Sequence, residues 1–367
     1  MICFYYPRIP NFPALWAGIG AQNGRIAELM VHRNYHEIDG ESPAACGRAL
    51  GRLFAPIVNE YIADCREDDS WFDQRHSAEP LLAQTAKYFP EYAKELQAYA
   101  VAAGVPLLDL WTMSIQDELD DDSAEKCTTI ITNAGRLIAH NEDWDPDATE
   151  DICILKKRCA GITTLELYYY GCPLGGTALS VCSNGYVQAI NSISHIDHRI
   201  GVPKIVLARR MAEIRNIETE LDGILAVPRS SGFAHNLADR DGRVTMVECT
   251  ARQNRVFHPN MPAVHTNHIQ HQDLETLAGD PDGKSTFRRY ETACEQACPI
   301  MTRAGAMALL SDESRGKNSS VFNRNTIARA VVDLDRRVAS FWLRREKSKG
   351  WMDYPIDFYS DAADLVA

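Results

Sequence analysis

The spacing of hydrophobic and polar positions changes near the end of the first third of the chain. Over residues 41–115, apolar residues recur every three or four positions, which is the spacing of helices with one buried face. Ser42, followed by a proline, is typical of a helix start, Pro90 interrupts the pattern, and Gly104 ends it. The pattern predicts a helical block, preceded by a turn-rich, strand-like segment over residues 1–40.

Beyond an acidic stretch at 117–125, which is typical of a solvated loop, short segments rich in Val, Ile, Thr and Tyr alternate with turns. Strands are predicted at 127–134, 136–144, 152–159, 164–171, 177–183, 186–193, 233–250 (a hairpin), 254–259, 263–269, 327–335 and 337–345, and helices at 202–215, 218–227, 284–297 and 301–312. Separate blocks of strands and helices indicate an α+β fold rather than a parallel sheet.

Composition excludes several classes of protein. The chain has 367 residues, 45% of them hydrophobic and 24% charged, which is ordinary for a globular protein. The net charge of −12 argues against nucleic acid as a partner, because phosphate binding needs clustered Lys and Arg. No apolar run reaches the length of a membrane span, and the amino terminus lacks a basic segment followed by an apolar one, so neither a membrane nor a signal peptide is expected.

The eleven cysteines include no Cys-x-x-Cys pair, which favours reduced thiols in a cytoplasmic protein over a disulfide framework. Cys294 and Cys298 are one helical turn apart and are interpreted as small residues on a helix face rather than as metal ligands. Cys127 stands at the junction between the acidic stretch and the first strand. Cleavage after Lys126 would give this cysteine a free α-amino group, whose pKa near 8 suits it to accept the thiol proton. The simpler alternative is a buried structural cysteine.

The segment "CTT" entering a strand, followed by "AHNEDW" on the returning strand, resembles the cysteine-type N-terminal nucleophile (Ntn) hydrolases. The branch of the acyl-coenzyme A:isopenicillin N acyltransferases and N-β-alanyl-amine hydrolases (peptidase family C45-like) is the most similar. Other stretches agree in order, over about residues 36–345: "HEIDGESPAACGRALGR", "CSNGYVQAINSI", "FAHNLADRDGRVTMVE", "VHTNHI" and "STFRRYE". The resemblance implies a four-layer αββα sandwich. It also implies a helical pro-segment, 1–126, that stays attached after self-cleavage, and a catalytic part, 127–367.

The resemblance also implies roles for single residues. Cys127 matches the nucleophile, and Asp143 the carboxylate that holds the nucleophile's amino group. Asn267 matches the asparagine that donates to the oxyanion. Arg324 matches a family arginine by rough spacing only. Each has a plainer interpretation: a turn acid for Asp143, a strand-end asparagine for Asn267, and a surface arginine for Arg324.

Three positions depart from the family. His140 stands where bile-salt hydrolases and penicillin V acylases have an arginine, three residues before the aspartate. Cys182 stands where an asparagine supplies a second oxyanion contact, which Asn184 replaces only if the turn shifts. Lys126 stands where self-cleaving relatives often have glycine. The expected substrate-binding residues are His140, Asn141, Cys182 and Asn184, together with Tyr169 of the tyrosine run at 168–170, which either packs in a strand or lines an acyl or aromatic-amine pocket.

The resulting hypothesis is an enzyme without a cofactor that hydrolyses the amide of a small N-acyl amine, such as a β-alanyl amine. The alternatives are an acyl-CoA-dependent N-acyltransferase and a non-catalytic scaffold member of the family. A thiol–histidine pair of Cys127 with His140 or His235 is the main rival mechanism, because it needs no processing. The cluster His265, His268 and His271 is interpreted as structural, because no His-Glu-x-x-His motif accompanies it.

Overall fold

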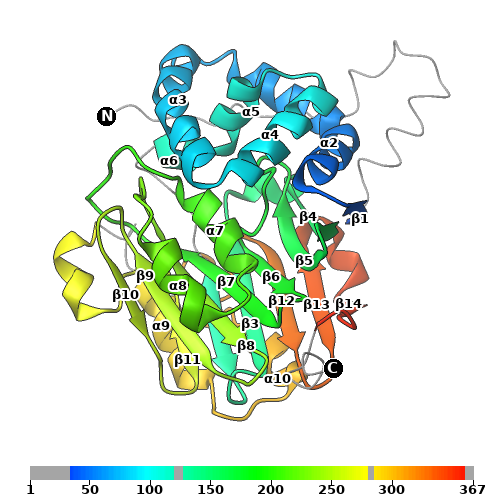
Figure 1. Ribbon diagram of the computed structural model, residues 1–367. Coiled ribbons are helices and arrows are strands. Elements are labelled where there is room, and N and C mark those ends of the chain that lie inside the picture. Colours follow the sequence, from blue (N-terminus) through cyan, green and yellow to red (C-terminus); the bar gives the residue numbers. More distant parts are fainter. Residues whose placement is uncertain (1–33, 120–126, 280–284, 360–367) are drawn as a thin grey trace.

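The computed structural model describes residues 34–119, 127–279 and 285–359, which form two stacked β-sheets between layers of helices (Figure 1). The large sheet has eight strands, and the small sheet has six. The large sheet runs, in spatial order, β1 (Tyr35–Gly40), β4 (Ile152–Cys159), β5 (Ile162–Tyr169), β6 (Leu179–Cys182), β7 (Tyr186–Ser192), β8 (Phe233–Asp239), β9 (Val244–Cys249) and β10 (Asn254–Phe257). The small sheet runs β11 (Ala263–His265), β2 (Thr128–Thr132), β3 (Leu137–Asp143), β12 (Thr326–Asp333), β13 (Val338–Leu343) and β14 (Met352–Pro355).

Helices cover the outer face of each sheet. On the large sheet lie α2 (Pro43–Cys65), α3 (Trp71–Tyr88), α4 (Pro90–Ala103), α5 (Leu107–Ser114), α6 (Gln116–Leu119), α7 (Lys204–Ala212) and α8 (Ile217–Leu225), and on the small sheet lie α9 (Ser285–Gln296) and α10 (Arg303–Leu309). Short 3₁₀ turns are η1 (Pro146–Glu150), η2 (Gln272–Leu277) and η3 (Arg344–Lys349). The α+β prediction and the αββα layering are therefore confirmed.

Both faces of β2 and β3 are buried, and this decides where their side chains go. Ile131 and Ile138 pack in the core between the two sheets. Their neighbours Ile130 and Leu137 pack against α9 and α10. Successive side chains on a strand point to opposite faces. The odd-numbered residues of β2 and the even-numbered residues of β3 therefore face the large sheet.

The chain segment before the acidic stretch packs against the large sheet. β1 pairs in parallel with β4, for example His36 with Leu155. Phe54 of α2 packs in one apolar core with Leu155 and Tyr168 of the large sheet. The predicted break at Pro90 separates α3 from α4, and Gly104 ends α4 with a φ of 74°, the left-handed conformation that glycine adopts most easily.

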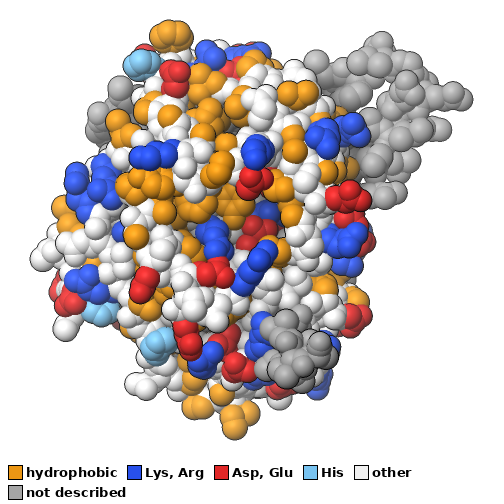
Figure 2. Space-filling model, in the orientation of Figure 1, with side chains coloured by type: hydrophobic (Ala, Val, Ile, Leu, Met, Phe, Trp, Pro, Cys, Tyr) orange, Lys and Arg blue, Asp and Glu red, His pale blue; other side chains and the backbone are white. Residues whose placement is uncertain are grey.

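The prediction that two strands close the chain was wrong, because β14 follows them and pairs with β13. Pro355 at its end and the polar residues between its apolar ones gave no clear strand pattern. Basic and acidic side chains are mixed across the face drawn in Figure 2. None of the helices within the described ranges has both the length and the hydrophobicity that crossing a membrane requires.

Candidate active site

Cys127 lies directly before β2, with 3% of its surface exposed. β2 and β3 are antiparallel neighbours, and Thr128 pairs with Asn141 and Thr129 with His140. The next step of this register places Cys127 opposite Glu142. Because strand side chains alternate, the thiol, Thr129, His140 and Glu142 share the face turned toward the large sheet.

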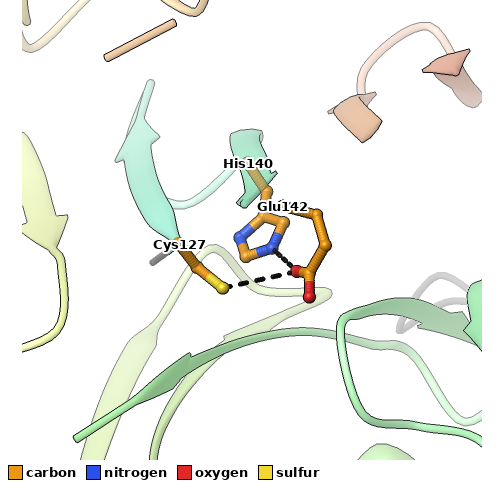
Figure 3. Close-up of side chains that lie close together, drawn as sticks. All are labelled: Cys127, His140 and Glu142. Carbon is orange, nitrogen blue, oxygen red and sulfur yellow. Dashed lines mark hydrogen bonds and ion pairs between the residues drawn. The ribbon is translucent and has the colours of Figure 1, made fainter. Parts of the chain in front are cut away.

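On this face the thiol, a carboxylate and an imidazole meet (Figure 3). The Sγ atom of Cys127 lies 3.5 Å from Oε2 of Glu142. The same oxygen lies 2.7 Å from Nε2 of His140. Tyr169, which reaches across from β5 of the large sheet, donates its hydroxyl to Oε1 of Glu142 at 2.7 Å. Glu142 is thus the centre of the cluster, in contact with three side chains that carry transferable protons.

The hydrogen bonds around His140 determine its tautomer. Asn236 donates to the Oδ1 atom of Asn191 at 2.8 Å, and this sets the orientation of the Asn191 amide. Thr129 donates its only hydroxyl proton to that same oxygen, also at 2.8 Å. The Thr129 oxygen must therefore accept from Nδ1–H of His140, 2.9 Å away. It follows that the contact between Nε2 of His140 and Glu142 is held by one shared proton.

Asp143 lies on the opposite face of β3, toward α10. It is completely buried and accepts a hydrogen bond from Nδ2 of Asn323 at 2.6 Å. Burial raises the pKa of Asp143 to about 6, although the Arg289 guanidinium and hydrogen bonds from Thr326 and Asn323 act in the opposite direction. Asn141 shares this face and donates to the carbonyl oxygens of α10 and of the loop after it, so its side chain points away from the thiol.

Arg289 of α9 connects the nucleophile strand to the predicted oxyanion residue. Its guanidinium donates to the carbonyl oxygen of Cys127 at 2.7 Å and to the hydroxyl of Thr128 at 2.9 Å. It also donates to Oδ1 of Asn267 at 2.7 Å, while Nδ2 of Asn267 donates to the carbonyl oxygen of Ser192 at 2.9 Å. Burial lowers the pKa of Arg289, and the nearby Asp143 counteracts this. One buried cation thus positions both Cys127 and Asn267.

Three of the expected site residues are placed elsewhere. Arg324 is exposed, and its backbone N–H donates to Lys317. Cys182 lies at the hairpin end of β6, where burial raises its pKa to about 12, and Asn184 of the same turn donates to the backbone of Glu213. β7 carries Asn191 of the site near its other end, so the structure does not bring this turn together with Cys127. Lys126 lies outside the described residues.

The structure also places the two histidines of the rival mechanism. His235 is buried beside Gln188, and burial lowers its pKa to about 3. His140 contacts Glu142 through Nε2, and a ring nitrogen of His140 lies within 4.8 Å of the Cys127 sulfur. In the described residues, one group has His, Cys and carboxylate ligand atoms close enough for a metal ion: Cys127, His140 and Glu142, with their ligand atoms within 4.8 Å of one another.

Two residues central to this geometry were not assigned roles from the sequence. Glu142 lies in "AHNEDW" and Arg289 in "STFRRYE", so both stand in stretches that carry the family resemblance. The alternation of strand side chains was a usable signal for Glu142, because it places residues two apart, here His140 and Glu142, on the same face of a strand. Arg289 is 162 positions from Cys127, and no local pattern joins two residues at that separation.

Comparisons with known proteins find chains similar to this one. Among solved structures, the chain is similar to a mutant of conjugated bile acid hydrolase from Clostridium perfringens, with 11% identity, 65% of this chain and 94% of that chain covered, and a TM-score of 0.40. It is also similar to penicillin V acylase from Agrobacterium tumefaciens, with 13% identity, coverage of 60% and 83%, and a TM-score of 0.40. No curated protein sequence matches the chain.

The family comparison covers more than half of the sequence. The model of the family described as acyl-coenzyme A:6-aminopenicillanic acid acyl-transferase matches residues 131–348, which includes β3 with Glu142 and Asp143, and α9 with Arg289. The Ntn resemblance seen in the sequence, and the expectation of an enzyme of the acyltransferase and amide hydrolase type, are confirmed by this match. The chain belongs to the acyl-coenzyme A:6-aminopenicillanic acid acyl-transferase family.

Proposed function

We propose that this chain is a self-activating amidohydrolase or acyltransferase in which Cys127 becomes the amino-terminal nucleophile after cleavage of the Lys126–Cys127 bond. The observation that carries the proposal is the surroundings of the Cys127 thiol. It is buried at the start of a strand, beside the Glu142 carboxylate and close to a buried guanidinium. A base that accepts the thiol proton and a cation nearby are the neighbours that activate a thiol, and a structural cysteine needs neither.

Cleavage divides the chain into 1–126 and 127–367. The described part of the first segment supplies strand β1 to the large sheet and helices to its outer face. Separation of the two parts would expose this apolar core to water and leave β4 without β1, one of its two neighbours. The packing therefore supports a complex in which both parts remain associated.

The new amino group would form beside Asp143. Continued by one step, the β2–β3 register sets Cys127 opposite Glu142, and Asp143 is the next residue along β3, where its carboxylate would approach the new amine. A carboxylate there would orient the amine and stabilise its protonated form. The amine would in turn accept the thiol proton during turnover.

Asn267 would stabilise the oxyanion. Its Nδ2 carries two hydrogens, of which the carbonyl oxygen of Ser192 accepts one. Arg289 holds the Oδ1 atom, so the amide cannot rotate by half a turn without losing this contact. A fixed donor costs no reorganisation when charge develops on the substrate oxygen, which is why such donors accelerate acyl transfer.

The reaction has two steps. The Cys127 thiolate attacks the carbonyl carbon of an amide, the carbon–nitrogen bond breaks, and the amine leaves with a proton from the α-ammonium group. Water or a second amine then attacks the thioester and releases the acyl group and the thiol. His140 and Tyr169 would border the bound acyl group through their contacts with Glu142.

The favoured substrate is a small N-acyl amine of the β-alanyl-amine type. With 3% of its surface exposed, Cys127 can be approached only by a slender acyl group, and the "NEDW" wording at 141–144 resembles the β-alanyl-amine hydrolases. Acyl-CoA-dependent transfer is the second candidate, and the family model that matches the chain favours it.

Intact-mass measurement tests the proposal first. We expect purified wild-type protein to separate into two fragments split at 126/127, and Cys127→Ala to remain a single chain of 41.0 kDa. A wild-type protein that is active as one uncleaved chain would refute self-activation. A panel of N-acyl amines and acyl-CoA thioesters, read out as a burst of acyl-enzyme on Cys127, then separates hydrolysis from transfer. Cleaved protein that forms no acyl-enzyme with any of them would favour the scaffold alternative.

A further inference from the structure

We propose that Glu142, held by His140 and Tyr169, is the base that removes the thiol proton of Cys127 in the intact chain and so starts self-cleavage. This inference rests on the proposed function, because it concerns the step that creates the amino-terminal cysteine. It assigns a role to a residue that no family resemblance assigned, and it separates the chemistry of maturation from the chemistry of turnover.

The intact chain has a problem that the mature enzyme does not have. Before cleavage the nitrogen of Cys127 belongs to a peptide bond, and an amide nitrogen is not basic. The proposed catalytic base therefore does not yet exist when the thiol must first react. Another acceptor is needed within reach of Sγ.

Glu142 meets this need by position. Its Oε2 atom lies 3.5 Å from Sγ of Cys127, within range of a sulfur hydrogen bond. Asp143, the neighbouring carboxylate, points to the other face of the strand, where Asn323 binds it. The imidazole of His140 contacts the same Glu142 oxygen through Nε2, at 2.7 Å.

The groups around Glu142 match the two acceptor oxygens of a carboxylate. His140 and Cys127 approach Oε2, and Tyr169 donates to Oε1. A carboxylate can accept all three of these hydrogen bonds, whereas a protonated carboxyl group would direct its own proton at one of the donors. Because Thr129 fixes the proton of His140 on Nδ1, the proton shared at Nε2 makes the ring an imidazolium when Glu142 is charged.

The protons balance through the reaction. The thiol proton passes to Oε2 of Glu142, and the thiolate attacks the carbonyl carbon on the amino side of Cys127. The carbon–sulfur bond forms, the carbon–nitrogen bond breaks, and Glu142 returns the proton to the departing nitrogen of Cys127. Water then hydrolyses the thioester and frees the thiol, with His140 protonated throughout. The new α-amino group takes over as the base for later turnovers.

The test compares two buried glutamates. E142Q removes the proton acceptor and keeps the size of the side chain. E166Q is the matched control, because Glu166 is equally buried in β5 and accepts a hydrogen bond from the N–H of Gly176, but has no contact with Cys127. Each full-length chain is synthesised in a cell-free system, and the cleaved fraction is followed by intact mass.

We expect E142Q to cleave at least about 100-fold more slowly than wild type, the lower range for loss of a general base, and E166Q to stay within about threefold. E142A should also be slow, and sodium formate, which supplies a small carboxylate, should restore its cleavage where sodium chloride does not. A merely structural role would not produce this rescue. Cleavage of E142Q at the rate of E166Q, or no rescue of E142A by formate, would overturn the proposal.

A second readout separates this inference from the proposed function. If wild-type protein never cleaves, self-activation fails, and the proton acceptor can still be tested on the intact chain. Alkylation of Cys127 by iodoacetamide is then followed by peptide mass from pH 6 to pH 10. Its midpoint should move downward in E142Q, because the charged carboxylate opposes a thiolate beside it, and should not move in E166Q. Equal profiles would refute the role of Glu142 as the acceptor.

Discussion

Between the sheets, the described residues include two buried pairs of a glutamate and a histidine with different surroundings. In one, Nε2 of His140 lies 2.7 Å from Glu142. In the other, Nε2 of His265 lies 3.0 Å from Glu248. Glu142 is otherwise contacted by the Tyr169 hydroxyl and the Cys127 thiol, whereas Glu248 accepts backbone N–H groups of the loop after β11.

The backbone donors make Glu248 a fixed anion. Burial alone would raise its pKa, but the hydrogen bonds from His265 and from the N–H groups of Gln270 and His271 lower the pKa below its ordinary value. Such a carboxylate holds a loop in place and has no proton to exchange. Glu142 instead faces side chains that can release protons. The same two residue types thus serve structure at one site and chemistry at the other, and their remaining neighbours decide which.

Arg289 should show the largest effect, because it joins the two regions through Cys127 and Asn267. We expect Arg289→Met to lose detectable cleavage and about 3–5 kcal/mol of unfolding free energy, the usual cost of breaking a buried charged network. The measurements are intact mass and chemical denaturation. Arg288→Met, at the exposed neighbouring position, is the control and should change neither. Normal cleavage in Arg289→Met would show that cleavage does not depend on the guanidinium.

Asp143 should show a pH dependence of stability opposite to that of Glu248. Its folded pKa of about 6 lies above the ordinary value of 3.8, so its contribution to stability is full below pH 4 and is lost as the pH rises through 6. The shift corresponds to roughly 3 kcal/mol. Relative to Asp143→Asn, the Asp143 protein should therefore lose about this amount between pH 4 and pH 7.

Both proteins should carry Cys127→Ala, so that the chain stays intact during chemical denaturation. Asp147→Asn, at an exposed position, serves as the control. A difference in unfolding free energy that stays constant from pH 4 to pH 7 would show that burial does not raise the pKa of Asp143 in the folded protein.

Glu248→Gln should affect stability more than chemistry. Hydrogen bonds to a charged group contribute about 1.5–3 kcal/mol, so the variant should lose an amount in this range at pH 7. Because the folded pKa of Glu248 is depressed, this difference should shrink as the pH falls below about 4.5. Cleavage should slow less than tenfold. A loss of cleavage as large as that of E142Q would show that the two pairs are not functionally distinct.

Thr129 should show the smallest effect. Thr129→Val keeps the shape of the side chain but removes the acceptor of Nδ1–H of His140, so the ring loses one of its two hydrogen bonds and is held less firmly against Glu142. We expect cleavage three- to tenfold slower, measured by intact mass, and recovery in Thr129→Ser. Wild-type speed in the valine variant would mean that Glu142 alone orients His140.

Much of the fold could be predicted from local patterns. The strand at 152–159, the break at Pro90 and the helix end at Gly104 follow from spacing and from the backbone preferences of proline and glycine. The junction at Cys127 was also recognisable, because a cysteine at the entry to a strand follows a polar loop there. Parallel pairing of β1 with β4 was not, because it joins segments more than a hundred residues apart.

The sequence by itself determined the elements, the candidate nucleophile and the family, since these depend on residues close together in the chain. Only the tertiary structure decided which face of β3 meets the thiol, because both faces are buried and the hydrophobic pattern does not distinguish them. That choice turns Glu142 toward the Cys127 thiol and Asp143 toward the opposite face of β3. Packing of α9 on the small sheet likewise placed Arg289 at the site and left Arg324 in solvent.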